Sequence, residues 1–174
     1  ADISYVDLNF CDTPKAIATG VYVGEAGAVL IDPGPGSCIE TLRSSLAAQG
    51  IGAADIDAVL VTHIHLDHAG AAGHLVRANP AVRVHVSDVG APHLVDPSRL
   101  VSSARRLYGD DLDTLYGEPI PIPQDNVEPI WGVAAGVKAF ATPGHASHHV
   151  CYLLDDGTLL AGDAAGVRIL PGTH

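Results

Sequence analysis

The sequence predicts an α/β protein built on a sheet with parallel strands, and three observations support this fold class. Residues 58–62 form a continuous apolar run, which is typical of a strand in a sheet covered on both faces. Residues 58–62, 69–78 and 82–86 have the patterns of a strand, a helix and a strand, the order of a parallel crossover unit. Hydrophobic residues make up 47% and charged residues 17% of the chain, with 19 glycines and 12 prolines. Over 174 residues, this composition favours one compact domain with many tight turns.

Three strands and one helix are expected in the first fifty residues. Ser37 and Glu40 match a capping box, in which each side chain accepts a hydrogen bond from a free N–H group at the start of the helix. Gly50 then ends this helix. The expected strands are an edge strand at residues 3–10 and a hairpin at residues 16–24 and 26–32.

The second half of the chain combines helices, an extended segment and three more strands. Residues 92–117 have a helical pattern, with Pro97 suited to a first turn. The prolines of residues 119–123 require an extended backbone and exclude this segment from a central strand. Gly157 fits a tight turn between the last two strands. The expected strands are residues 137–141, 150–154 and 158–161.

Charge and composition exclude several classes of partner. The formal net charge is -11, from 20 acidic and 9 basic residues, so a clustered basic surface for nucleic acid is not expected. No apolar run approaches the length of about 20 residues that a membrane span needs. The N-terminus lacks the basic and apolar regions of a signal peptide. Three scattered cysteines form no C-x-x-C pair. We therefore expect a cytoplasmic protein with a small-molecule substrate.

The most informative motif is a cluster of metal-ligand side chains directly after the apolar strand at residues 58–62. His63, His65, Asp67 and His68 place four such side chains within six residues. Two further candidates, at the end of other apolar stretches, are His145 and Asp163. Ligand sites of open α/β sheets lie outside the carboxyl ends of the strands, so these residues are expected to meet there. Imidazole and carboxylate without thiolate suit Zn²⁺, Fe²⁺ or Mn²⁺, and zinc is the default for hydrolysis.

This series of motifs resembles the metallo-β-lactamase-fold hydrolases, with the glyoxalase II-like and lactonase-like branches as nearest neighbours. The segment that ends in Asp32-Pro33-Gly34 matches the family's first motif. The resemblance implies an αβ/βα sandwich with one or two metal ions in its crevice. It also implies that Asp32 orients the metal loop. By the family pattern the metal ligands are His63, His65 and His145 for the first ion, Asp67 and His68 for the second, and Asp163 as the bridge.

The resemblance implies a metal-dependent hydrolase in which a metal-bound hydroxide cleaves a small ester, thioester or lactone. Asp67 and His68 are the expected catalytic residues beside the second ion. Asp163 stands where many true β-lactamases carry Cys, which disfavours antibiotic hydrolysis. His65 stands where flavodiiron proteins carry a carboxylate, which argues against an oxygen-reducing diiron centre.

The end of the sequence departs from the family pattern. The family's fifth motif is a His well beyond the bridging Asp, and here the sole His after Asp163 is His174. We therefore expect residues 1–174 to form a single domain whose C-terminal half is incomplete. Such a sandwich would expose an apolar face and an unpaired strand edge, which favours association between copies.

Two other functions stay open at this point. A mononuclear iron dioxygenase, similar to the persulfide dioxygenases of this fold, needs only two His and one Asp, here His63, His145 and Asp163. A fragment that keeps the fold without chemistry is the second alternative.

Candidate substrate contacts are weaker than the candidate metal ligands. Residues of the helical region after 82–86 are placed to cover the crevice, and Arg105 and Arg106 suit an anionic substrate. The remaining histidines 74, 85, 93 and 149 are expected at the surface or at a solvent-facing strand start. The full set of candidate substrate contacts is Tyr108, Arg105, Arg106 and His148.

Overall fold

The computed structural model describes residues 3–24, 26–130 and 137–165, which form two sheets. The first sheet has six strands in sequence order, antiparallel from β1 to β3 and parallel from β3 to β6. Its strands are β1 (Ile3–Asp7), β2 (Ala18–Val23), β3 (Ala28–Ile31), β4 (Ile56–Leu60), β5 (Arg83–Val86) and β6 (Val127–Pro129). The second sheet is an antiparallel set of three strands: β7 (Val137–Ala141), β8 (Val150–Leu154) and β9 (Leu159–Leu160).

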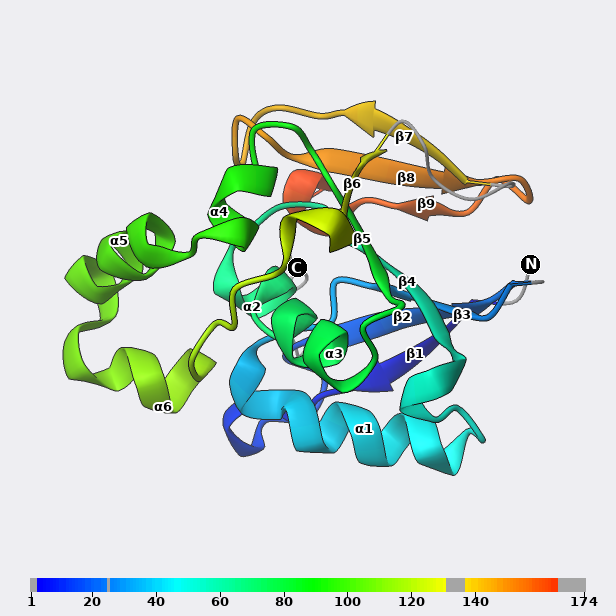
Figure 1. The fold of residues 1–174 in the computed structure, drawn as a ribbon, viewed down its shortest axis with the longest axis horizontal. Helices are drawn as coiled ribbons and strands as arrows, with labels where there is room; N and C mark the ends of the chain where they lie inside the picture. The colour runs from blue at the N-terminus through cyan, green and yellow to red at the C-terminus, as the bar shows by residue number, and fades with distance from the viewer. Residues whose placement is uncertain (1–2, 25, 131–136, 166–174) are drawn as a thin grey trace, which may run out of the picture.

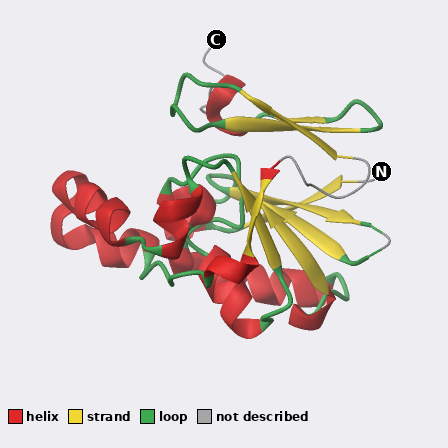
Figure 2. Cartoon of the chain, turned by 45° about the horizontal axis from the view of Figure 1, so that its top comes forward, coloured by secondary structure: helices red, strands yellow, loops and turns green. Residues whose placement is uncertain are grey.

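One group of helices packs on a face of the first sheet, the second sheet covers the other face, and the remaining helices project from one end of the molecule (Figures 1 and 2). The α-helices are α1 (Ile39–Ala48), α2 (Leu66–Ala69), α3 (Ala72–Ala78), α4 (Ala91–Val95), α5 (Ser98–Tyr108) and α6 (Leu112–Tyr116). Short 3-10 turns are η1 (Phe10–Asp12), η2 (Gly36–Cys38), η3 (Ala53–Asp55), η4 (Gly109–Asp111), η5 (Gln124–Asn126) and η7 (Gly162–Ala165). This layering confirms the predicted α/β fold class. All six described α-helices precede β7 in the chain.

Two apolar cores follow from the alternation of side chains along the buried strands. On β3, Leu30 faces the core under the helices, while Val29 and Ile31 face the core between the sheets. The same alternation on β4 sends Val59 to the helices and Leu60 to the second sheet. A central strand that must be apolar on both faces reads as a continuous apolar run, which is why the sequence identified it.

The parallel crossover from β4 through α2 and α3 to β5 is confirmed, as are the hairpins β2–β3 and β8–β9. The capping box is wrong. Turn η2 precedes α1, and the Ser37 hydroxyl donates to the Leu115 carbonyl oxygen at 2.6 Å, so it does not cap the helix. The helical region at 92–117 breaks into three helices. Pro97 directly precedes the first residue of α5, and Gly109, with a φ of +57°, ends that helix. Strand β6 was not expected.

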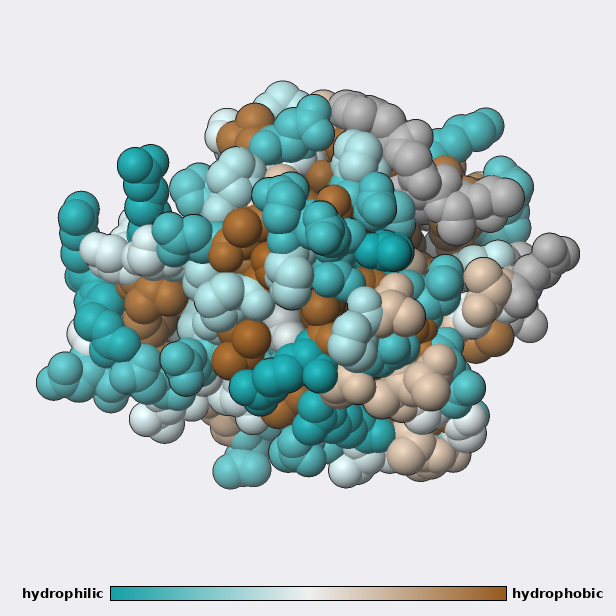
Figure 3. Space-filling model, in the orientation of Figure 1, coloured by the Kyte–Doolittle hydropathy of each residue, from teal (hydrophilic) through white to brown (hydrophobic). Residues whose placement is uncertain are grey.

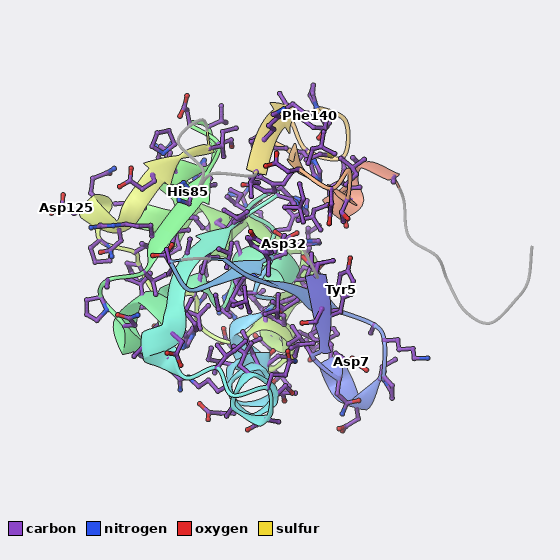
Figure 4. All side chains as sticks on the ribbon, turned by 90° about the vertical axis from the view of Figure 1, so that its right-hand side faces the viewer. Tyr5, Asp7, Asp32, His85, Asp125 and Phe140 are labelled. Atoms are coloured by element: carbon purple, nitrogen blue, oxygen red, sulfur yellow. The ribbon has the colours of Figure 1, made fainter. Side chains whose placement is uncertain are left out.

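The face of the molecule in Figure 3 is mostly hydrophilic, with apolar patches that include one between α5 and α6. Large apolar side chains are exposed on the outer strands, and Figure 4 labels two of them, Tyr5 on β1 and Phe140 on β7. Self-association through such surfaces stays a prediction. Among the residues that the structure describes, no helix has both the length and the apolar character that crossing a bilayer requires.

Candidate metal centre

The candidate ligands gather where the strands of the two sheets end. His63 follows β4 by three residues, His145 lies in the loop before β8, and Asp163 follows β9 in turn η7. A backbone hydrogen bond from the Val150 amide to the Thr62 carbonyl oxygen, 2.9 Å long, joins β8 to the segment after β4. Strands from both sheets therefore bring distant parts of the sequence to one place, as expected for a crevice at strand ends.

Three imidazoles form the first cluster. His65 Nδ1 lies 3.0 Å from His63 Nε2 and 3.0 Å from His145 Nε2. A tetrahedral ion with Zn–N bonds of about 2.0–2.1 Å would hold its nitrogens about 3.3 Å apart, so these spacings fit such an ion. Burial and then the neighbouring imidazoles lower the pKa of His63 to about 2. His63 is therefore neutral at ordinary pH, the state that a metal ligand requires.

A second cluster adjoins the first through one carboxylate. His68 Nε2 lies 3.3 Å from Asp163 Oδ1 and 3.6 Å from Asp67 Oδ2. The other oxygen of Asp163, Oδ2, lies 3.4 Å from His145 Nε2. Each oxygen of Asp163 therefore faces a different cluster, which is the arrangement that a bridging ligand needs. The donor atoms of His63, His68 and Asp163 also lie within 4.8 Å of one another.

Asp32 holds His68 and Thr62 in place through hydrogen bonds. Its Oδ1 accepts a hydrogen bond from the Thr62 amide at 2.7 Å, and its Oδ2 accepts from the Thr62 hydroxyl at 2.7 Å and from His68 Nδ1 at 2.9 Å. With Nδ1 of His68 donating to Asp32, Nε2 is the atom that faces Asp67 and Asp163. Asp32 itself takes a φ of +49°, which non-glycine residues rarely adopt.

The same carboxylate sets the tautomer of a second histidine. Because the Thr62 hydroxyl donates to Asp32, it accepts at its oxygen from His63 Nδ1, 3.1 Å away. His63 Nε2 then carries no proton and directs its lone pair toward His65. Asp32 thus prepares one imidazole directly and another through Thr62, which is how residues behind metal ligands commonly act.

The pKa of His68 is raised by the carboxylates around it. Burial would lower its pKa, but the hydrogen bond and charge of Asp32, followed by the charges of Asp67 and Asp163, raise the pKa to about 9. Without an ion, His68 therefore holds a proton at neutral pH. A cation at the site would take the place of that proton.

His149 belongs to the site although the sequence placed it at a solvent-facing strand start, and that expectation is wrong. Its side chain is buried, and its Nε2 accepts a hydrogen bond from the Asp163 amide at 3.1 Å. Nδ1 must then be the donor, to Thr142 Oγ1 at 2.8 Å. His149 thus holds the backbone that presents Asp163. The one signal in the sequence was its place directly before a buried strand.

One other histidine, His85, also differs from its expected surface position. His85 lies buried on β5, with Nδ1 3.4 Å from the Pro129 carbonyl oxygen. Its label in Figure 4 lies beside β6 and apart from that of Asp32. His148 Nε2 accepts a hydrogen bond from the Ile64 amide at 3.2 Å and so steadies the loop between His63 and His65.

The candidate substrate contacts divide between two cavities. Tyr108 and His148 line a cavity of about 450 Å³ that also touches His65, His145 and Asp163. The structure does not bring Arg105 and Arg106 to this cavity. Both line a separate cavity of about 1120 Å³ on the other side of α5, and Arg105 pairs with Asp113 at 2.7 Å.

The side of the site formed by Asp67 and His68 opens into a third cavity of about 330 Å³. Strands β1 and β2 line one wall, through Tyr5 and Gly20, and Leu159 of β9 lines another. His174, the sole His after Asp163, lies outside the described residues.

Comparisons with known proteins agree with this fold. Residues 12–173 match the family model described as the metallo-beta-lactamase superfamily. The chain is 33% identical over 149 residues to an atrochrysone carboxyl ACP thioesterase of Aspergillus fumigatus, covering 83% of this chain and 39% of that protein. It is 34% identical over 122 residues to a hydroxyacylglutathione hydrolase of Vibrio campbellii, covering 68% of this chain and 38% of that protein.

A solved structure is similar over nearly the whole chain. It is the crystal structure of an archaeal metallo-beta-lactamase superfamily protein from Sulfolobus tokodaii, with a TM-score of 0.73 and 27% identity, covering 96% of this chain and 65% of that one. The chain thus spans less than two thirds of the length of each of these relatives. The family match, the fold and the clustered His and Asp side chains together show that this chain belongs to the metallo-beta-lactamase superfamily.

Proposed function

We propose that this chain belongs to a metal-dependent hydrolase that cleaves an ester or thioester bond in a small molecule. The observation that supports it most is the carboxylate of Asp163, whose two oxygens lie 3.3 Å from His68 and 3.4 Å from His145. Relatives that are named a thioesterase and a hydroxyacylglutathione hydrolase support the same class of reaction.

The side chains divide the work of holding the metal. His63, His65 and His145 would hold a first ion, and His68, Asp67 and Asp163 would hold or share a second. A divalent ion bound there polarises a carbonyl group and makes water a nucleophile near neutral pH. We take zinc as the cofactor, with iron and manganese as the alternatives that imidazole and carboxylate ligands also allow.

Asp67 is placed to handle protons in this reaction. Its carboxylate is partly exposed, lies beside His68 and faces the 450 Å³ cavity, so it can accept a proton from the attacking water. The same group returns the proton to the leaving alkoxide or thiolate, so water and the ester or thioester give an acid and an alcohol or thiol. His68, which Asp32 orients, lies close to both Asp67 and Asp163 and so would help to hold the two carboxylates in place.

The test measures metal content and hydrolysis on the same preparations. Zinc-reconstituted protein should bind one or two ions per chain and hydrolyse members of a panel of esters, thioesters and lactones. Asp163→Asn should lower zinc affinity by about tenfold to a hundredfold and abolish most hydrolysis. The matched control is Asp125→Asn, an exposed aspartate far from the site in Figure 4, which should leave both unchanged.

Two results would contradict the proposal. One is protein that binds zinc stoichiometrically yet hydrolyses nothing in the panel. The other is an Asp163→Asn variant that keeps wild-type zinc affinity and rate. One iron per chain together with oxygen uptake on a persulfide would instead support the dioxygenase alternative.

A further inference from the structure

The cavity of about 450 Å³ beside the metal centre has one polar wall and one apolar wall. His65, Asp67, His145 and Asp163 form the polar wall, at the candidate ligands. Helix α5 and Tyr116 of α6 form much of the opposite wall. A substrate whose carbonyl group lies at the metal ligands would therefore place the adjoining acyl group against α5.

The apolar wall follows from the spacing of residues along α5. Leu100, Ala104 and Leu107 recur at intervals of four and three, so they share one helical face. Tyr108 extends this face at the end of the helix. The small Ala104 leaves room in the middle of the wall, between larger side chains on either side.

Two aromatic rings, those of Tyr108 and Tyr116, are among the residues that line the cavity. The Tyr116 ring stacks on Phe10, with centroids 5.8 Å apart and planes at 26°. Tyr108 meets the Tyr116 ring edge-on, at 5.0 Å and 65°. Ring pairs of this kind are favourable beyond their buried area, and they offer a ring edge or face to a further aromatic group.

No lysine or arginine is among the described residues that line this cavity. Arg105 and Arg106 lie on the other side of α5, where Arg105 already pairs with Asp113. The charged residues that do line the cavity are the carboxylates Asp67 and Asp163. A carboxylate on the part of the acyl group that lies against α5 would have no cationic side chain as partner there, which is unfavourable.

We propose that this cavity binds an uncharged acyl group that carries an aromatic ring, and that Ala104 sets the size of ring admitted. The inference rests on the proposed hydrolase function and names the acyl class of its substrate. It replaces the sequence-based expectation that Arg105 and Arg106 would recognise an anionic substrate.

The experiment compares thioesters of one thiol, N-acetylcysteamine, on zinc-reconstituted protein. The acyl groups are acetyl, phenylacetyl and 4-carboxyphenylacetyl. We expect kcat/KM for phenylacetyl to exceed that for acetyl by about tenfold or more, the amount that burying a phenyl group supplies. The carboxylated ring should lose about tenfold relative to phenylacetyl, because its charge is left unpaired in the cavity.

Variants on the two sides of α5 localise the effect. Ala104→Phe should lower kcat/KM for phenylacetyl by about tenfold and leave acetyl within about twofold, because it fills the cavity but not the metal centre. The control Arg106→Ala, on the other side of the helix, should change neither. Circular dichroism melting confirms that both variants fold. Equal rates for acetyl and phenylacetyl, or an equal loss of both in Ala104→Phe, would overturn the inference.

A binding measurement separates this inference from the proposed function. The uncharged probe 4-fluorophenylacetamide should show fluorine NMR line broadening with wild-type protein and none with Ala104→Phe. If the probe binds in this pattern but no ester, thioester or lactone of the panel is hydrolysed, the cavity assignment stands and the hydrolase proposal fails. If thioesters are hydrolysed but the probe does not bind, the cavity assignment fails alone.

Discussion

Asp32→Asn should change how the stability of the metal-free protein depends on pH. In the folded protein the pKa of His68 is about 9, against 6.5 for an ordinary histidine, and the raising contribution is led by Asp32. A raised folded pKa stabilises the protein fully below the unfolded pKa, and this stabilisation is lost as pH rises through the folded pKa. The window therefore runs from about pH 6.5 to about pH 9.

The expected magnitude follows from the difference between these pKa values. Each unit corresponds to about 1.4 kcal/mol, so the whole window is worth about 3 kcal/mol for a side chain that is only 16% exposed. Between pH 7.5 and 9.5 about 2 kcal/mol of this should be lost. Above pH 7.5 the histidines with lowered pKa values, such as His63, are neutral in both states and contribute little.

The assay is urea unfolding, followed by circular dichroism with chelator present, at pH 7.5 and 9.5. The free energy of unfolding should fall by at least 1 kcal/mol more in wild type than in Asp32→Asn, which carries no charge for His68. Other groups that titrate in this range, such as the thiol of Cys38, are common to both proteins and cancel. Equal pH dependence in the two proteins, within about 0.3 kcal/mol, would refute the reasoning about Asp32 and His68.

Three further predictions concern residues behind the metal centre. His149→Ala should lower zinc affinity about tenfold in chelator competition, because the Asp163 amide loses its hydrogen-bond acceptor, and His149→Gln should keep part of the affinity. Equal affinity in wild type and both variants would exclude this anchoring role. Gly162→Ala should lower the free energy of unfolding in urea by about 2 kcal/mol and weaken zinc binding, because the φ of Gly162 is +48° and a Cβ there would lie 2.7 Å from His149 Nε2. A variant as stable as wild type would show that the turn accommodates the methyl group. Tyr152→Phe removes a buried hydrogen bond to the Val61 carbonyl oxygen and should cost about 1–2 kcal/mol without changing zinc affinity; a loss of zinc binding would contradict this purely structural role.

The sequence by itself determined the fold class and the candidate ligands. A strand buried on both faces must be apolar throughout, so residues 58–62 were recognisable without any partner. Metal ligands are recognisable for a similar local reason, because imidazoles and carboxylates crowded after such a strand have few other uses. His63, His65 and Asp67 are close in sequence, so their proximity needed no knowledge of the rest of the chain.

Only the tertiary structure decided what surrounds those ligands. The path from Asp32 through Thr62 to His63 joins residues about thirty positions apart, and His149 reaches Asp163 across two strands. Hydrogen bonds of this kind depend on which strands become neighbours, and no local pattern encodes that.

The same limit explains where the structure differs from the local expectations. Ser37 matches the sequence pattern of a helix cap, but its hydroxyl donates a hydrogen bond to the carbonyl oxygen of Leu115, which is far along the chain. Arg105 and Arg106 lie in the expected helix, but on the face that lines a different cavity from the metal centre, and there Arg105 pairs with Asp113. A local motif states what a side chain is able to bind, whereas the packing of distant segments decides which partner lies within reach.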